Sequence, residues 1–184
     1  MSEKYRLLIC KVMRVVVFTT GILAGFSVFG WEVKPRAPED SVVDFPIAYE
    51  SNARGDRAEV NRNEDDEIKL KVLLAAGFIQ YSPNSCPTLQ IDSRTPVHHN
   101  EIGKDCAVET HTVSINLGDI IDNQIISLPL HRLMNGSQLA VRFVTSSGEY
   151  RESKFSLRNS KQAITASIGT DVEVTPSIEQ TSAP

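Results

Sequence analysis

The sequence has few of the features that support catalysis, cofactor binding or sugar binding. It contains no phosphate-binding glycine loop, no H-E-x-x-H zinc motif and no G-x-S-x-G nucleophile motif. Aromatic residues make up 7% of the chain and include one tryptophan, so no series of aromatic rings is available to stack on sugars. We therefore predict that the protein is not an enzyme and uses no cofactor. An unrecognised hydrolase stays open as an alternative, because a Ser-His-Asp set can form from distant residues.

Positive charge is scarce after the first thirty residues. Residues 1–30 carry a net charge of +3 and the whole chain carries −4, so residues 31–184 carry −7. An acidic domain repels the nucleic-acid backbone and anionic lipids, and we predict no nucleic-acid partner. The 154 residues that follow the first thirty are enough for one domain with tails.

Charged residues are also absent from Val15 to Trp31, directly after a segment that carries four basic residues. A basic start followed by an uncharged apolar run is typical of a signal peptide or a membrane anchor, which we place at residues 1–30. Val28 and Gly30 stand at positions −3 and −1 of a possible cleavage between Gly30 and Trp31. We therefore predict an extracytoplasmic protein. It is periplasmic, anchored in the membrane by an uncleaved segment and facing the periplasm, or secreted.

Residues 31–67 contain three prolines and a dense charged run from residue 54 to residue 67. Such a composition buries too little apolar area to offset its ordering entropy, so we predict an acidic, largely disordered linker. Within it, Arg54, Gly55 and Asp56 match the tripeptide that integrins recognise on flexible, exposed segments. A chance match in a stretch rich in arginine and aspartate is the competing explanation.

Apolar residues alternate with polar ones from Ile68 onward, which predicts β-strands. The candidate strands are residues 68–74, 78–81, 89–91, 112–117, 125–128, 139–143 and 150–157. The last two are predicted to form a hairpin. Leu130 to Asn135 predicts one helical turn that ends at Gly136, and Ala163 to Ile168 predicts a last strand or a helical turn. We predict an all-β domain over residues 68–168, an antiparallel β-sandwich (Ig-like) or a partly open barrel, with a disordered tail at 169–184.

Two cysteines, Cys86 and Cys106, follow the predicted leader. An even number of cysteines in an oxidising compartment predicts one disulfide bond. A metal site with nearby histidines, or two free thiols, are the alternatives.

Histidines His98, His99 and His111 are the weak candidates for metal ligands, and they define our alternative prediction, a periplasmic metal-handling protein. Neighbouring carboxylates could complete a zinc or copper site. Adjacent residues in an extended segment point to opposite sides, however, which disfavours one ion shared by His98 and His99. Surface residues of a polar loop are the competing interpretation.

A series of short motifs in the C-terminal half resembles a known family. They are Thr88-Leu89-Gln90-Ile91-Asp92-Ser93, Cys106-Ala107-Val108-Glu109, the turn at 130–136, the strand at 138–145, Lys154-Phe155-Ser156-Leu157 and residues 160–164. Their order over residues 88–164 resembles the invasion-associated locus B type of small periplasmic proteins. The resemblance implies a periplasmic or secreted β-sandwich, linked in some members to host-cell invasion and without established catalysis. It supplies no functional residues, since it lies in structural positions.

Taken together, these features predict a non-catalytic protein of the envelope or of the secreted fraction that binds another protein. The expected partner is an unidentified protein of the envelope or of a host cell, with the membrane as a second contact if the leader is uncleaved. Partner capture by an exposed sheet edge is one possible mode, with residues 112–117 or 138–145 as the candidate edge strand.

Overall fold

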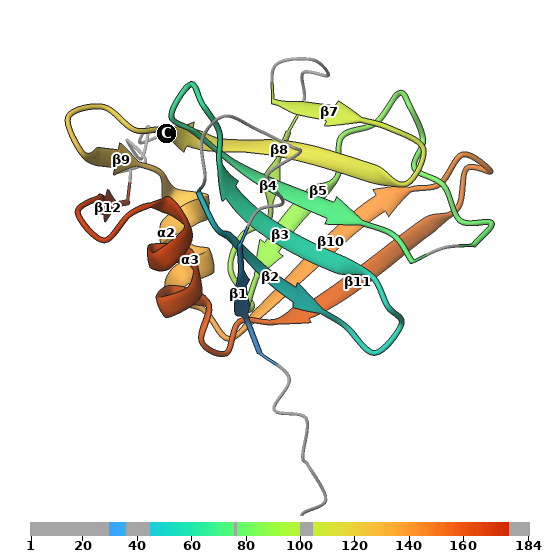
Figure 1. The fold of residues 1–184 in the computed structure, drawn as a ribbon. Coiled ribbons are helices and arrows are strands. Elements are labelled where there is room, and N and C mark those ends of the chain that lie inside the picture. The colour runs from blue at the N-terminus through green and yellow to red at the C-terminus, as the bar shows by residue number, and fades with distance from the viewer. Residues whose placement is uncertain (1–29, 36–44, 76, 100–104, 177–184) are drawn as a thin grey trace, which may run out of the picture.

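The computed structural model describes residues 30–35, 45–75, 77–99 and 105–176 (Figure 1). Two antiparallel sheets surround one apolar core, and a small third sheet has two parallel strands. The larger sheet contains, in spatial order, β1 (Glu32–Lys34), β2 (Ile47–Ser51), β3 (Arg57–Arg62), β4 (Glu67–Leu73), β8 (Thr112–Asp119) and β7 (Cys106–Val108). The smaller sheet contains β11 (Tyr150–Ser156), β10 (Gln138–Val144), β5 (Thr88–Ile91) and β6 (Val97–His98). Neither sheet closes on itself within these residues. The prediction of a mostly β, antiparallel fold is confirmed.

The alternation of apolar residues places one face of each central strand in the core. Leu70 on β4 pairs with Ile115 on β8, and both side chains are fully buried. On the smaller sheet, Val141 of β10 pairs with Leu89 of β5, and these are equally buried. Complete burial of such a side chain stabilises the folded state by about 1.5–3 kcal/mol. The shared core therefore holds the two sheets together.

Two short helices lie side by side at one end of the sheets (Figure 1). Helix α2 (Leu128–Asn135) begins where the Ser127 hydroxyl accepts a hydrogen bond from the Leu130 amide, and it ends at Gly136. Helix α3 (Ser160–Ile168) turns Ile164 and Ile168 into the core. The predicted turn at 130–135 is thus part of a longer helix, and the predicted last element is helical.

The prediction of a disordered linker over residues 31–67 is wrong for the residues described there, which include β1, β2 and β3. Strand β3 is rich in polar residues but is buried on both faces. Its Glu59 carboxylate lies 2.7 Å from Lys34 Nζ and 2.9 Å from Arg57 Nε. Pairing with these cations lets an acidic residue lie in a covered strand, which composition alone does not reveal.

Two further predictions about strands are corrected. Residues 78–81 are described but form no strand, although Tyr81 makes an isolated bridge with Thr145. In the predicted tail, Glu173–Thr175 forms β12, which pairs in parallel with β9 (Gln124–Ile126). Residues 177–184 lie outside the described part.

The proposed edge strands are also corrected. Strand β8 lies between β4 and β7, and β10 lies between β11 and β5, so both are interior and their backbone groups are already paired. The outermost strands are β1 and β7 in the larger sheet and β11 and β6 in the smaller one. Neither predicted strand can therefore accept a partner strand.

Candidate binding pocket

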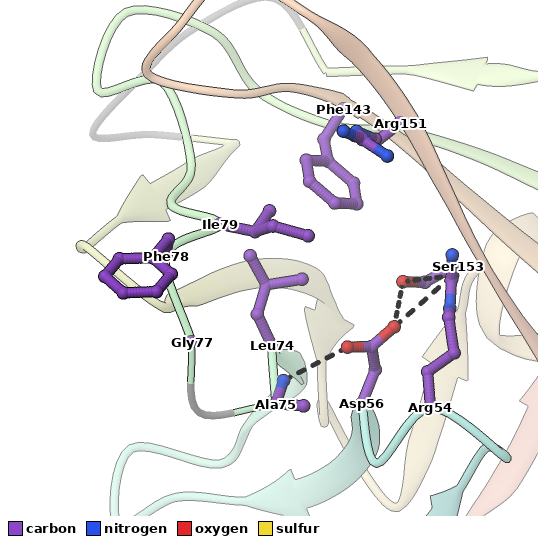
Figure 2. Close-up of a pocket in the computed structure, with 10 residues that line it drawn as sticks. All are labelled: Arg54, Asp56, Leu74, Ala75, Gly77, Phe78, Ile79, Phe143, Arg151 and Ser153. Atoms are coloured by element: carbon purple, nitrogen blue, oxygen red, sulfur yellow. Dashed lines mark hydrogen bonds and ion pairs between the residues drawn. The ribbon is translucent and has the colours of Figure 1, made fainter.

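A pocket of about 360 Å³ lies where the β2–β3 turn, the chain after β4 and the β10–β11 hairpin meet (Figure 2). Leu74, Ile79 and Phe143 form its apolar wall, as the close-up shows. Asp56 and Ser153 lie on the opposite side, together with Arg54. The pocket thus combines an apolar wall with a small polar cluster, which is the usual composition of a binding site.

The polar side of the pocket is organised around the buried Asp56 carboxylate, which is 7% exposed. Its Oδ2 accepts hydrogen bonds from Ser153 Oγ at 2.6 Å and from Asn52 Nδ2 at 3.2 Å. Its Oδ1 accepts one from the Ala75 amide at 3.1 Å. Arg54 Nη2 lies 3.4 Å from Oδ2 and also donates to the Glu152 carbonyl. This cluster ties the β2–β3 turn of the larger sheet to β11 of the smaller one.

The environment of Asp56 keeps it ionised. Burial alone disfavours the charged form of Asp56. Hydrogen bonds from Ser153, the Ala75 amide and Asn52 favour the charged form, as does the positive charge of Arg54, and together they outweigh the effect of burial. The net effect lowers the pKa of Asp56 below its usual 3.8. These donors hold the Asp56 carboxylate in place at the pocket floor.

The apolar side of the pocket extends to the surface. Phe78 is fully exposed and Ile79 is 44% exposed. Behind them, the Phe143 ring packs at 4.7 Å from the ring of Tyr81, which is buried and donates from its hydroxyl to the Val72 carbonyl. A fully exposed phenylalanine beside an apolar wall is a feature of surfaces that contact another molecule.

The predicted recognition tripeptide occupies the turn between β2 and β3 and not a flexible linker. Gly55 adopts a φ of +85°, which favours glycine, and its amide donates to the Asn52 carbonyl. The carboxylate of Asp56 points inward into the cluster described above. The expectation of a freely presented Arg54-Gly55-Asp56 motif is therefore wrong, because its acidic group is buried and hydrogen-bonded.

The structure brings two of the three histidines to a second pocket, of about 510 Å³, which His98, His99 and Cys86 line. His111 is not among the residues that line it. Burial lowers the pKa of His99 below its usual 6.5, although the nearby Asp105 charge opposes this. In the described part of the chain, no group of three or more histidine, cysteine, aspartate or glutamate side chains could hold a metal ion. The alternative of a metal-handling protein thus finds no ligand set there.

The predicted disulfide between Cys86 and Cys106 is present, with 6.0 Å between the two Cα atoms. Cys86 precedes β5 of the smaller sheet, whereas Cys106 begins β7 of the larger one. The bond therefore links the two sheets covalently. A disulfide of this kind indicates an oxidising compartment.

Most of the predicted leader, residues 1–29, lies outside the described chain, and cleavage is therefore untested. Gly30 and Trp31 are described and both are buried. The Trp31 indole Nε1 donates to the Ser156 carbonyl at 2.8 Å, and its backbone amide donates to the Arg158 carbonyl at 2.9 Å. No helix among the described residues is both long and apolar enough to cross a bilayer.

Sequence reasoning missed the cluster and the apolar wall of the first pocket. Asp56 and Ser153 are 97 residues apart, and neither lies in a motif. The one local signal was Asn52, whose side chain accepts from the amides of Arg54 and Asp56 and so fixes the turn. The apolar neighbours of Phe78 predict a strand there, which the structure does not form.

Comparison with solved structures shows a similarity of fold. The fold matches the crystal structure of invasion associated protein B from Bartonella henselae, with a TM-score of 0.50 and 13% sequence identity. The match covers 76% of this chain and 93% of the other. No protein-family model matches the chain, and no curated protein is similar in sequence. The resemblance predicted for residues 88–164 is therefore confirmed in the fold, over a longer part of the chain.

Proposed function

We propose that this protein works outside the cytoplasm as a non-catalytic binding protein, which captures another protein through the pocket lined by Leu74, Ile79 and Phe143. We class its two facing sheets as a β-sandwich. The periplasm, a membrane-tethered position facing it, and the secreted fraction are the compartments consistent with the disulfide and the apolar leader.

The observation that carries the proposal is the exposed apolar surface at the pocket entrance. Phe78 is fully exposed, and an apolar wall of Leu74 and Ile79 lies next to it. Exposed aromatic side chains beside a pocket are typical of the few residues that contribute most to binding a protein partner. A single exposed apolar residue is common, but one that adjoins a pocket about 360 Å³ in volume is more informative.

The chemistry of the pocket favours an extended segment that inserts an apolar side chain. Asp56 is already hydrogen-bonded by the protein, so the floor offers little to a charged group. Arg151, at the rim, pairs with Glu149 at 2.7 Å. An aliphatic or aromatic side chain would bury apolar area without leaving these charges unpaired. The name of the structural relative, an invasion-associated protein, makes a partner on the envelope or on a host cell the natural candidate.

Site-specific photo-crosslinking tests the proposal. A photoreactive phenylalanine analogue is placed at Phe78 or at Ile79, and the matched control carries it at Ile121, which is 69% exposed and does not line this pocket. We expect the same crosslinked protein at both pocket positions in the native envelope and none at Ile121. Crosslinking that is equal at all three positions would contradict a pocket-specific partner.

Affinity measurements with the purified crosslinked protein complete the test. We expect Phe78→Ser to weaken binding at least tenfold, which corresponds to about 1.4 kcal/mol. Ile121→Ser removes exposed apolar area elsewhere and should leave the affinity unchanged. Circular dichroism and the unfolding midpoint of both variants establish that they remain folded. Equal affinities for the two variants would refute the role of the pocket.

A further inference from the structure

One buried acid of the larger sheet makes no ion pair with any residue that the structure describes. The buried acids among the described residues are Glu50, Asp56 and Glu59. Asp56 lies beside Arg54, and Glu59 lies beside Lys34 and Arg57. Within the described chain no ion pair involves Glu50, although its side chain is only 4% exposed. A buried carboxylate without a counter-charge destabilises a fold.

The surroundings of Glu50 are apolar on its own sheet. It lies on β2 two residues after the buried Ala48, and it pairs across the sheet with the buried Ala58. Burial, with the nearby Glu32 charge, raises the pKa of Glu50 above its usual 4.5. The backbone amide of Gly30 donates a hydrogen bond to the carboxylate and opposes that rise. The strand register agrees, because Tyr49, the residue before Glu50, pairs with Glu32 of β1. Glu50 therefore faces the beginning of the described chain.

That beginning is packed into the domain. The Trp31 amide donates to the Arg158 carbonyl at 2.9 Å, and the indole donates to the Ser156 carbonyl at 2.8 Å. Gly30 is also buried, and a Cβ added to it would lie 3.1 Å from the Arg158 oxygen. The backbone nitrogens of Gly30 and Trp31 are consecutive and so lie within about 4 Å of one another. The Trp31 nitrogen thus lies one peptide unit from the Gly30 amide, which donates to the Glu50 carboxylate.

We propose that export processing cuts the Gly30–Trp31 bond and that Glu50 is the counter-ion of the new α-ammonium group on Trp31. An export peptidase catalyses the hydrolysis. The amide C–N bond breaks, hydroxyl from water joins the Gly30 carbonyl carbon, and hydrogen from water joins the Trp31 nitrogen. That nitrogen takes a further proton from solvent at neutral pH. Gly30 leaves with the leader, so Glu50 loses a neutral amide donor and gains a cation.

The geometry gives this processing an order and a consequence. Because Gly30 and Trp31 are buried in the folded domain, cleavage precedes folding, while the chain is still extended. One ammonium hydrogen keeps the bond to the Arg158 carbonyl, and another is free for Glu50. Pairing removes the cost of an isolated buried carboxylate, so the cleaved chain is more stable than the uncleaved one. This inference does not depend on the proposed pocket.

A double-mutant cycle tests the pairing. One chain begins at Trp31 with a free amine, and the other retains Phe29 and Gly30; each is made with Glu50 and with Glu50→Gln. Urea unfolding at pH 7 gives the ratio of folded to unfolded protein. We expect Glu50→Gln to lower this ratio at least tenfold in the Trp31 chain and less than threefold in the extended chain. Equal reductions would overturn the proposal.

The matched control is Glu59→Gln, a buried acid of the same sheet that pairs with side-chain cations. It should lower the ratio equally in both chains, because its partners do not depend on the chain start. A further outcome is that Glu50→Gln prevents folding only in the chain that begins at Trp31. The interaction energy between Glu50 and the α-ammonium group is then larger than the cycle can measure, and the pairing is supported. Loss of folding in both chains would indicate a general role and overturn it.

Two direct measurements complete the test. The mass of the protein exported by its native host should match a chain that begins at Trp31, and a different start would overturn the proposal. NMR titration of the α-amino group should give a pKa above the ordinary 7.7–8.0, and Glu50→Gln should return it to about that range. An ordinary value in the unmodified Trp31 chain would exclude a buried ion pair with Glu50.

Discussion

Replacement of Asp56 by asparagine tests whether the polar cluster joins the two sheets. The amide can still accept from the Ala75 backbone, but its NH₂ group faces two donors, Asn52 Nδ2 and Arg54 Nη2. Hydrogen bonds to a charged group contribute about 1.5–3 kcal/mol each and are not additive within a cluster. We expect a net loss of about 3 kcal/mol in the free energy of unfolding, or roughly 6–12 °C in the unfolding midpoint.

The effect should also depend on pH in a defined direction. The pKa of Asp56 is lowered in the folded state, so its contribution to stability is present above the unfolded-state value near 3.8. It is lost as the pH falls through the lower, folded-state pKa. The difference between the native protein and Asp56→Asn should therefore be full at pH 7 and shrink below about pH 4.

Urea unfolding monitored by circular dichroism from pH 2.5 to pH 7 measures both quantities. The control is Asp119→Asn, at the exposed end of β8, which should change the unfolding free energy by no more than about 0.5 kcal/mol. A loss below about 1 kcal/mol for Asp56→Asn at pH 7, or a difference that does not change with pH, would refute the assigned role of the cluster.

Two further substitutions address the link between the sheets and the packing of α2. Replacing both Cys86 and Cys106 by alanine opens a loop with a sequence separation of 20 and should lower the unfolding free energy by about 3 kcal/mol, measured in urea without reductant. Unchanged stability would contradict a covalent contribution of the bond. A Cβ at Gly136 would lie 2.5 Å from Ile91 Cγ2. Gly136→Ala should therefore lower the free energy of unfolding by about 1–3 kcal/mol. Gly77→Ala is the neutral control in the same unfolding assay, because a Cβ added there would lie 3.9 Å from the Ala75 oxygen. If both variants lose the same free energy of unfolding, the clash at Gly136 is not the cause.

Local periodicity predicted the central strands well. Leu70, Ile115 and Val141 each lie in an alternating stretch, and each is buried in a strand of the predicted region. The β10–β11 hairpin was also predictable, because a short Ser-Gly turn separates two alternating runs. Such patterns depend on neighbours two residues apart, which a single sequence displays.

The errors share a physical cause. Strand β3 was assigned to a linker because Arg57, Glu59 and Asn61 are polar, and its burial depends on Lys34, which is 25 residues away from Glu59. Phe78 was assigned to a strand because it is apolar, yet it is exposed at the pocket. In both cases the arrangement of segments in space, which a local pattern does not show, decides whether a side chain is covered.

The sequence by itself determined the mostly β class of this protein, the pairing of Cys86 with Cys106 and the apolar start of its chain. These follow from residue spacing, cysteine number and the charge of a continuous segment. Only the tertiary structure decided that Asp56 meets Ser153, that the pocket lies beside Phe78, and that Glu50 faces Gly30. The reason is that buried charges are stabilised by specific donors, and chain folding alone brings those donors within hydrogen-bond distance.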